Sequence, residues 1–235
     1  MDNKIIIFLG YFIHLALGSC GQEDKGNCRE FNEQYAKIYS KSNGKPDTLT
    51  LMKALNEIIV NDRKCVDAYL TRGDIYFSID QSSNAKNDFQ QVLKLDTANL
   101  YALYQMGLLY QYEGLHDSSI YVLNKAIKIK THGNMLIDYP QVTNELSTSD
   151  NKYDVESAEI IYRQGVNFYY KRNLELSKRY FDYCINNKYL LDKVYLYKGA
   201  IFIELNDKKK ACEYFFKAKD FGNIDASSYI EKYCN

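Results

Sequence analysis

Apolar residues along much of this chain recur at the spacing of a helix. Residues 68–79 (AYLTRGDIYFSI) and 200–205 (AIFIEL) both show the pattern, which places their apolar side chains on one helical face. Polar runs at 80–83 and 113–117 separate successive segments, and such clusters favour turns. The pattern therefore predicts helices joined in antiparallel pairs, or helical hairpins.

The same pattern, less regular, extends toward both ends of the chain. Residues 28–41 and 47–62 flank the sequence SNGKP, which is a strong turn signal. We predict a degenerate N-terminal hairpin at residues 28–65. Residues 226–235 predict a short terminal helix whose polar side chains would cover the last apolar face.

The first apolar run, Ile5–Leu17, is thirteen residues long, whereas a membrane-spanning helix needs about 20. It follows Lys4 and precedes the small residues Gly18 and Ser19, the order found in cleaved export signals. Residues 1–19 are therefore predicted to be a signal peptide.

The sequence Leu17-Gly18-Ser19-Cys20 resembles the lipobox of bacterial lipoproteins. The resemblance implies lipidation of Cys20, with residues 20–27 as a flexible tether. We expect an exported chain that is lipid-anchored to a bacterial membrane, namely the outer membrane. The alternative is an ordinary signal peptide that ends near a cysteine.

Four glycines, Gly73, Gly107, Gly165 and Gly199, form two pairs, each 34 residues apart. Taking the glycine as position 8 defines units at 66–99, 100–133, 158–191 and 192–225. Position 20 is small in every unit: Ala85, Ser119, Ser177 and Ala211. Positions 11 and 24 are large and apolar: Tyr76, Tyr110, Phe168 and Phe202, then Phe89, Leu123, Phe181 and Phe215.

These units resemble the tetratricopeptide repeat (TPR) family, whose repeat has this length. The resemblance implies an all-α, right-handed α-solenoid in which position 8 lets the two helices of a hairpin approach closely. The family's helix-ending proline is replaced at position 32 by Thr97, Thr131, Tyr189 and Asn223. TPR pairs at 66–133 and 158–225 are separated by an insertion at 134–157, which is either part of the binding side or a tolerated surface loop.

Composition narrows the possible partners. The chain is 46% hydrophobic and 26% charged, as expected of a globular protein. Its 30 basic and 30 acidic residues cancel, so the chain has no excess of positive charge of the kind that drives nucleic-acid binding, and we expect no nucleic-acid partner. There are 23 tyrosines and no tryptophan.

Cysteine placement suggests two disulfides, because the start of one helix lies beside the end of its antiparallel partner. This relationship brings Cys28 near Cys65, and Cys212 near Cys234. Such bonds fit an oxidising, exported location. The alternative is a set of buried thiols, and we expect Cys184 to be one in either case.

No enzyme motif is evident. The sequence lacks a phosphate-binding glycine loop, a nucleophile-elbow serine and zinc-spaced His or Cys pairs. We therefore expect no catalysis, no metal and no small-molecule cofactor.

The TPR resemblance assigns groove-lining roles to positions 2, 5, 9, 12 and 13 of each first helix. The two middle repeats place many tyrosines there, and tyrosine suits peptide contact. The alternative is that these rings pack against the insertion or reflect the chain's tyrosine surplus. Lys and Asn, which grip a peptide carboxylate at positions 5 and 9 in some family members, are missing. The candidate partner-binding residues are Tyr101, Tyr104, Tyr112, Tyr162, Tyr169 and Tyr170.

The leading functional hypothesis is a membrane-tethered scaffold that binds a protein or peptide of the bacterial envelope without catalysis. The alternative is an accessory lipoprotein of a surface glycan or nutrient uptake system.

Overall fold

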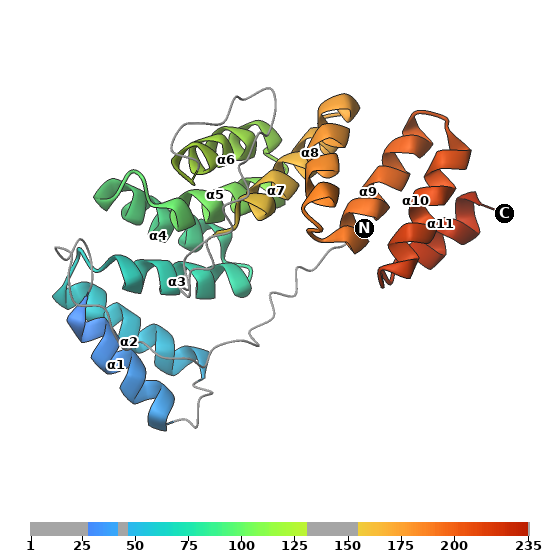
Figure 1. Ribbon diagram of the computed structural model, residues 1–235. Coiled ribbons are helices and arrows are strands. Elements are labelled where there is room, and N and C mark those ends of the chain that lie inside the picture. The colour runs from blue at the N-terminus through green and yellow to red at the C-terminus, as the bar shows by residue number, and fades with distance from the viewer. Residues whose placement is uncertain (1–27, 42–46, 131–154, 235) are drawn as a thin grey trace. The chain divides into compact units, whose positions relative to one another are not determined.

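The computed structural model describes residues 28–41, 47–130 and 155–234 (Figure 1). The predicted signal peptide, Cys20, the tether and nearly all of the predicted insertion lie outside these residues. The described part contains helices and no strand. Its helices are α1 (Arg29–Lys41), α2 (Thr48–Asn61), α3 (Val66–Ser78), α4 (Ser82–Leu95), α5 (Leu100–Tyr112), α6 (His116–Lys130), α7 (Ser157–Tyr170), α8 (Leu174–Asn186), α9 (Leu191–Glu204), α10 (Lys208–Asp220) and α11 (Ala226–Tyr233).

The chain divides between Thr97 and Ala98 into two compact units. The first contains α1 to α4 and the second α5 to α11. This boundary falls between two repeats that the sequence had grouped as one pair. None of the described helices is both long and apolar enough to cross a membrane.

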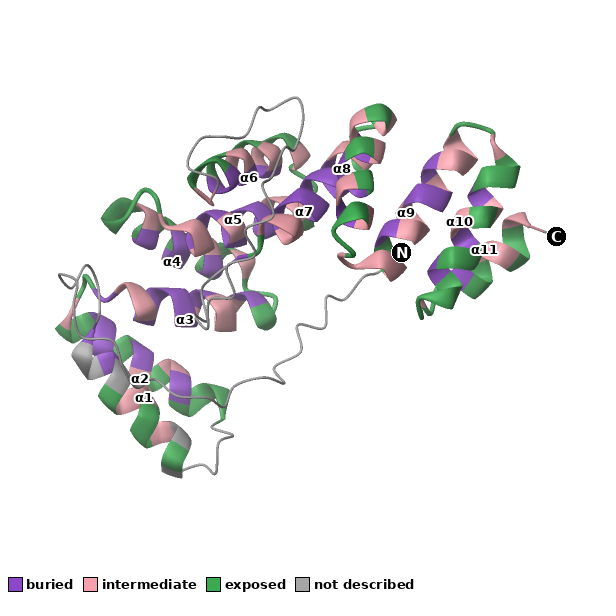
Figure 2. Ribbon diagram, in the orientation of Figure 1, coloured by how far each residue is buried: buried purple, intermediate pink, exposed green. Residues whose placement is uncertain are grey.

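Consecutive helices pair as hairpins, most extensively α3 with α4, α5 with α6, α7 with α8, and α9 with α10. Buried residues lie on the helix sides that meet, and exposed residues on the opposite sides (Figure 2). The predicted all-α fold of helical hairpins is thereby confirmed.

The position-8 glycines provide the close approach within each hairpin. A Cβ atom built at these glycines would lie only 2.4 to 2.8 Å from a side-chain atom of position 24. The position-24 side chain, a phenylalanine ring or a leucine, fills the space that a Cβ atom would occupy. It is itself completely buried. The four pairs are Gly73 with Phe89, Gly107 with Leu123, Gly165 with Phe181, and Gly199 with Phe215.

The turn inside each hairpin has the same backbone form. In the first, the Gln81 amide donates to the Tyr76 carbonyl (2.8 Å) and the Asp80 amide donates to the Phe77 carbonyl (3.2 Å). These two hydrogen bonds close the end of the helix around a residue in the left-handed conformation. That residue is at position 15 in every repeat, although only one is a glycine: Asp80, Gly114, Arg172 and Asn206, with φ of 59°, 73°, 61° and 59°.

A polar contact joins successive hairpins at an equivalent place. The side chain at position 7 donates to position 25 of the preceding hairpin, as Arg72 does to Asn56 (2.7 Å). Lys198 pairs with Asp182 in the same way. Gln164 donates to Asn124 (2.7 Å) although 40 residues separate them instead of 16. The insertion therefore leaves the packing of α7 on α6 in register.

Helix α11 ends the second unit. It packs on α10, with the rings of Tyr229 and Tyr233 5.1 and 6.2 Å from that of Phe215. In the repeat numbering, Tyr233 occupies position 8, where every full repeat has glycine. The second helix of another repeat could not pack closely against that bulky side chain. Helix α11 is therefore a capping helix, as predicted.

Candidate functional site

The six predicted groove tyrosines all belong to α5 and α7, which contact each other within the second unit. The structure separates them by exposure. Tyr112 and Tyr170 are 54% and 53% exposed, whereas Tyr162 is only 5% exposed. Tyr101, Tyr104 and Tyr169 are half-buried. We call Tyr112 and Tyr170 the exposed tyrosine pair.

Tyr104 connects α5 to α7 through a hydrogen bond. Its hydroxyl donates to Oε1 of Glu159 (2.6 Å), and the hydroxyl of Tyr189 donates to Oε2 of the same carboxylate. Nε of Arg163 donates to Oε1 at 2.6 Å. Burial alone would raise the pKa of Glu159, but Arg163 and the two hydroxyls outweigh burial and lower it. The hydroxyl of Tyr104 is therefore engaged within the protein.

Tyr162 lies in the core, which differs from its predicted place in a groove. Its ring is 6.1 Å from that of Phe181 and 6.3 Å from that of Tyr197. Burial raises the pKa of Tyr162, since ionisation would leave a charge away from water. The next hairpin supplies Tyr197 to cover this side of α7, so Tyr162 cannot reach a partner while the hairpins stay packed.

The remaining tyrosines lie near the surface. The hydroxyl of Tyr101 accepts from Nε2 of Gln105 (2.8 Å) within α5. Tyr169 stands edge-on to both Tyr170 and Tyr197, each at 5.4 Å. Burial, assisted by the charge of Glu204, raises the pKa of Tyr169 to about 12. The exposed ring of Tyr170 stacks on His116 at 5.0 Å and 3°.

A buried polar network that the sequence analysis missed lies beside Tyr170, whose ring stacks on His116. Oδ1 of Asn167 accepts from Nε2 of Gln111 (2.9 Å), and Nδ1 of His116 lies 3.1 Å from the same oxygen. Nδ2 of Asn167 donates to Oγ of Ser119 (2.8 Å), which donates to the Gly107 carbonyl (2.8 Å). An asparagine among apolar residues of a core helix is the signal that could have predicted it. The network fixes α7 against the α5–α6 hairpin.

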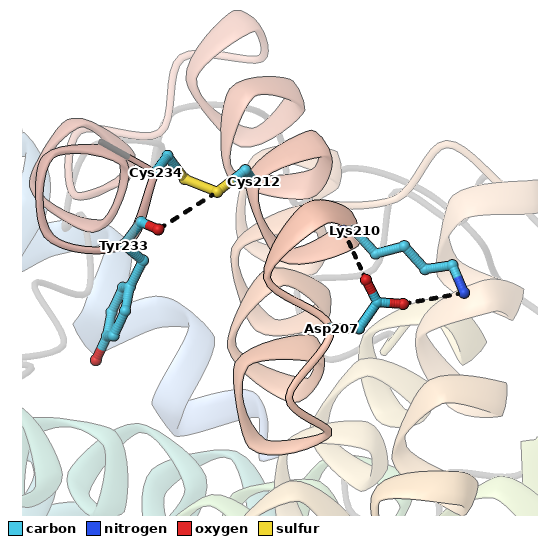
Figure 3. Close-up of a disulfide and its surroundings, with 5 residues drawn as sticks. All are labelled: Asp207, Lys210, Cys212, Tyr233 and Cys234. Carbon is cyan, nitrogen blue, oxygen red and sulfur yellow. Dashed lines mark hydrogen bonds and ion pairs between the residues drawn. A yellow bond between two sulfur atoms is a disulfide. The ribbon is translucent and has the colours of Figure 1, made fainter.

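The candidate disulfides differ in the structure. Cys212 on α10 and Cys234 after α11 are bonded, with an S–S distance of 2.11 Å and Cα atoms 5.6 Å apart (Figure 3). This bond attaches the capping helix to the last repeat. At the start of α10, the Asp207 carboxylate caps the helix by accepting from the Lys210 amide (3.0 Å).

Cys28 and Cys65 are free thiols in the structure, in contrast to the predicted bond. Both are buried, at 5% and 1% exposure, and burial together with the adjacent Cys28 raises the pKa of the Cys65 thiol. The two sulfurs are therefore neighbours, as the antiparallel hairpin predicted, but are not bonded. Cys184 is a completely buried thiol whose pKa burial raises.

The described residues contain no group of three or more His, Cys, Asp or Glu side chains that could hold a metal ion. A small surface pocket of about 280 Å³ lies where the end of α9 meets α11. Its walls are Ile203, Asn206, Lys208, Lys232 and Tyr233. The geometry as a whole presents aromatic and polar contact surface.

Residues 66–99 and 100–132 match the family described as tetratricopeptide repeat, and repeats of this kind generally serve as non-catalytic scaffolds for protein interaction. No curated protein matches the chain.

Several solved structures are similar. MamA from Desulfovibrio magneticus RS-1 is 14% identical, with a TM-score of 0.62 over 84% of this chain and 96% of that one. Another MamA structure is 19% identical, with a TM-score of 0.60 over 87% and 96%. PilW, a type IV pilus biogenesis factor, is 16% identical, with a TM-score of 0.58 over 85% and 88%. At these identities the likeness shows the fold alone. The chain thus carries tetratricopeptide repeats at residues 66–132 and has the all-helical repeat fold of tetratricopeptide-repeat proteins.

Proposed function

We propose that this chain is a lipid-anchored scaffold that binds a protein or peptide partner in the bacterial envelope. The partner contacts the second unit at the exposed tyrosine pair. The repeats supply a rigid framework, and the lipid on Cys20 keeps that framework at the outer membrane.

The observation that carries the binding proposal is the exposure of Tyr112 and Tyr170 at the ends of α5 and α7. Each is about half exposed, yet the helices that carry them are held by the Asn167 network. A tyrosine ring on a rigid support offers apolar area and one hydroxyl at a small entropic cost. The pair is therefore suited to an extended or helical peptide.

The tether rests on the sequence around Cys20. A single acyl chain binds membranes only marginally, so stable anchoring needs the two or three chains typical of bacterial lipoproteins. Labelling cells with a clickable fatty acid should mark the wild type but not Cys20→Ser. Equal labelling of both would contradict the tether.

The partner surface can be tested separately by photo-crosslinking in intact cells. A photoreactive phenylalanine analogue replaces Tyr112 or Tyr170, and the matched control carries it at Tyr121 on α6, which is 62% exposed. We expect one discrete adduct from positions 112 and 170 and none from 121. Adducts of equal yield at all three positions would mean non-specific contact. A partner that proves to be a glycan or nutrient transporter would favour the accessory role instead.

A further inference from the structure

His116, at the start of α6, lies against the exposed ring of Tyr170 at the end of α7. The two rings are stacked, with their centroids 5.0 Å apart and their planes 3° from parallel. The Tyr169 ring stands edge-on to that of Tyr170 at 5.4 Å, yet Tyr170 remains 53% exposed. His116 therefore covers one face of the ring and leaves much of the rest open to solvent.

The imidazole of His116 is itself fixed by the buried Asn167 network. Oγ of Ser119 donates its only hydrogen to the Gly107 carbonyl, so it must accept from Nδ2 of Asn167. Oδ1 of Asn167 consequently faces Gln111 and His116. This oxygen can only accept, so Nδ1 of His116 carries the hydrogen and donates to it at 3.1 Å. A completely buried asparagine thus sets the direction of the half-buried imidazole.

A second contact joins the same two segments but involves neither ring. Lys171, the residue after Tyr170, pairs with Asp117, the residue after His116. The Asp117 side chain is 83% exposed and that of Lys171 is 37% exposed, and ion pairs this open to water contribute little. The stack on His116 is therefore the contact that holds the Tyr170 ring, and the ion pair offers a matched control.

We infer that His116 is a positioning residue of the partner surface, because it holds the Tyr170 ring in the orientation that the partner contacts. This inference rests on the proposed function, since it concerns the same exposed ring. A side chain that moves freely in solution loses conformational freedom when a partner orders it, and this loss weakens binding. A ring already stacked on a fixed imidazole avoids most of that loss.

The orientation of the ring is tested without a partner, by fluorine NMR on the full chain in detergent with a ring-fluorinated tyrosine at position 170 alone. Stacking on an aromatic ring displaces the fluorine signal through the ring current. We expect a displaced signal in the wild type, in His116→Phe, which keeps an aromatic ring, and in Asp117→Asn, which removes the ion pair. His116→Ala should move the signal to its position in urea-unfolded protein. An undisplaced signal in the folded wild type would overturn the inference.

Partner contact is measured in the same backgrounds by photo-crosslinking in cells, with the photoreactive phenylalanine analogue in place of Tyr112. We expect His116→Ala to lower the yield of the adduct about three- to tenfold, with a nearly unchanged melting temperature of the purified protein. His116→Phe and Asp117→Asn should keep the yield of the wild type. Because His116 acts through Tyr170, His116→Ala should have no further effect in a Tyr170→Ala background.

A yield that His116→Ala leaves unchanged, or lowers equally with and without Tyr170, would overturn the inference. A loss of yield that only follows a loss of melting temperature would do the same. In each of these cases, a lower yield from Tyr170→Ala alone would leave the proposed function standing. A yield that Tyr170→Ala does not change would contradict the proposed function and the inference together.

Discussion

Phe181 packs its ring against the backbone of Gly165, so closely that a Cβ atom at Gly165 would lie 2.8 Å from Cε1 of that ring. Three other hairpins repeat the relationship with a ring or a leucine. The glycine is thus fixed by packing, which outweighs its low helix propensity.

Replacing Gly165 by alanine should therefore destabilise the protein. Overpacking costs about 1–3 kcal/mol, and the gain in helix propensity returns about 1 kcal/mol. We expect a net loss of up to about 2 kcal/mol in urea unfolding, and a larger loss for Gly165→Leu.

Gly114 is the matched control for this size dependence. It has a φ of +73° and no atom within 4 Å of an added Cβ, so its substitution costs only backbone strain. Leucine and alanine should cost nearly the same there. A stability for Gly165→Ala equal to or above the wild type would refute the packing account.

Arg72→Met should be strongly destabilising. Nε and Nη2 of Arg72 donate to Asp88 at 2.8 and 2.6 Å, and the Asp88 side chain is only 5% exposed. Removing the guanidinium leaves a buried charge without a partner, which typically costs about 3–5 kcal/mol. Chemical denaturation measures the loss, and Arg72→Met with Asp88→Leu should recover most of it.

Lys198→Met provides the comparison. Lys198 pairs with Asp182, whose side chain is 55% exposed and stays hydrated when the lysine is removed. The stability lost in Lys198→Met should be much smaller than the stability lost in Arg72→Met. Equal losses would show that burial of the acid does not determine the cost.

Glu159, which is bonded to Tyr104, Tyr189 and Arg163, should make the stability of the protein depend on pH in the acidic range. The folded pKa of Glu159 lies below its ordinary value, so its contribution is present above the unfolded pKa of about 4.3 and is lost as pH falls through the folded pKa. The free energy of unfolding in urea should fall more steeply below about pH 4.3 for the wild type than for Glu159→Gln. Parallel pH profiles would contradict this assignment.

The cysteines can be assigned by peptide mapping without reduction. We expect a Cys212–Cys234 crosslinked peptide, with Cys28 and Cys65 in separate, unlinked peptides. Cys184 should be alkylated only after unfolding. Loss of the first bond through Cys212→Ser and Cys234→Ser should cost about 3 kcal/mol by loop entropy.

A Cys28–Cys65 crosslinked peptide would contradict the free thiols of the structure. The alkylation is done on folded and on urea-unfolded samples, because both thiols are buried and would escape reagent in the native state.

The period of the sequence was sufficient to predict the hairpins and the capping helix. Spacing identified Gly165 and Phe181 as equivalent positions of a repeating unit, and the structure shows that these two residues contact each other. The left-handed turns at Asp80, Arg172 and Asn206 were not evident, since glycine marks that position only at Gly114. Their backbone is determined by the packing of the helices on either side.

The individual roles of the groove tyrosines could not be predicted in the same way. A repeat position indicates which side of a helix a residue occupies, but not what the next hairpin supplies to cover it. Tyr162 is covered by Tyr197, and Tyr104 is bonded to Glu159 from 55 residues away. Only the pair at the helix ends stays exposed.

The most direct test of partner binding at this surface uses the double variant Tyr112→Ala and Tyr170→Ala, with Tyr121→Ala as control. The affinity for the partner identified by crosslinking is measured beside the melting temperature. Interface anchors typically cost about 2 kcal/mol when truncated, roughly a thirtyfold loss in affinity, whereas half-exposed rings contribute little to the core. We predict such a loss with nearly unchanged melting for the double variant, and no effect for Tyr121→Ala. Unchanged affinity, or a fall in affinity that only follows a fall in melting temperature, would contradict the account.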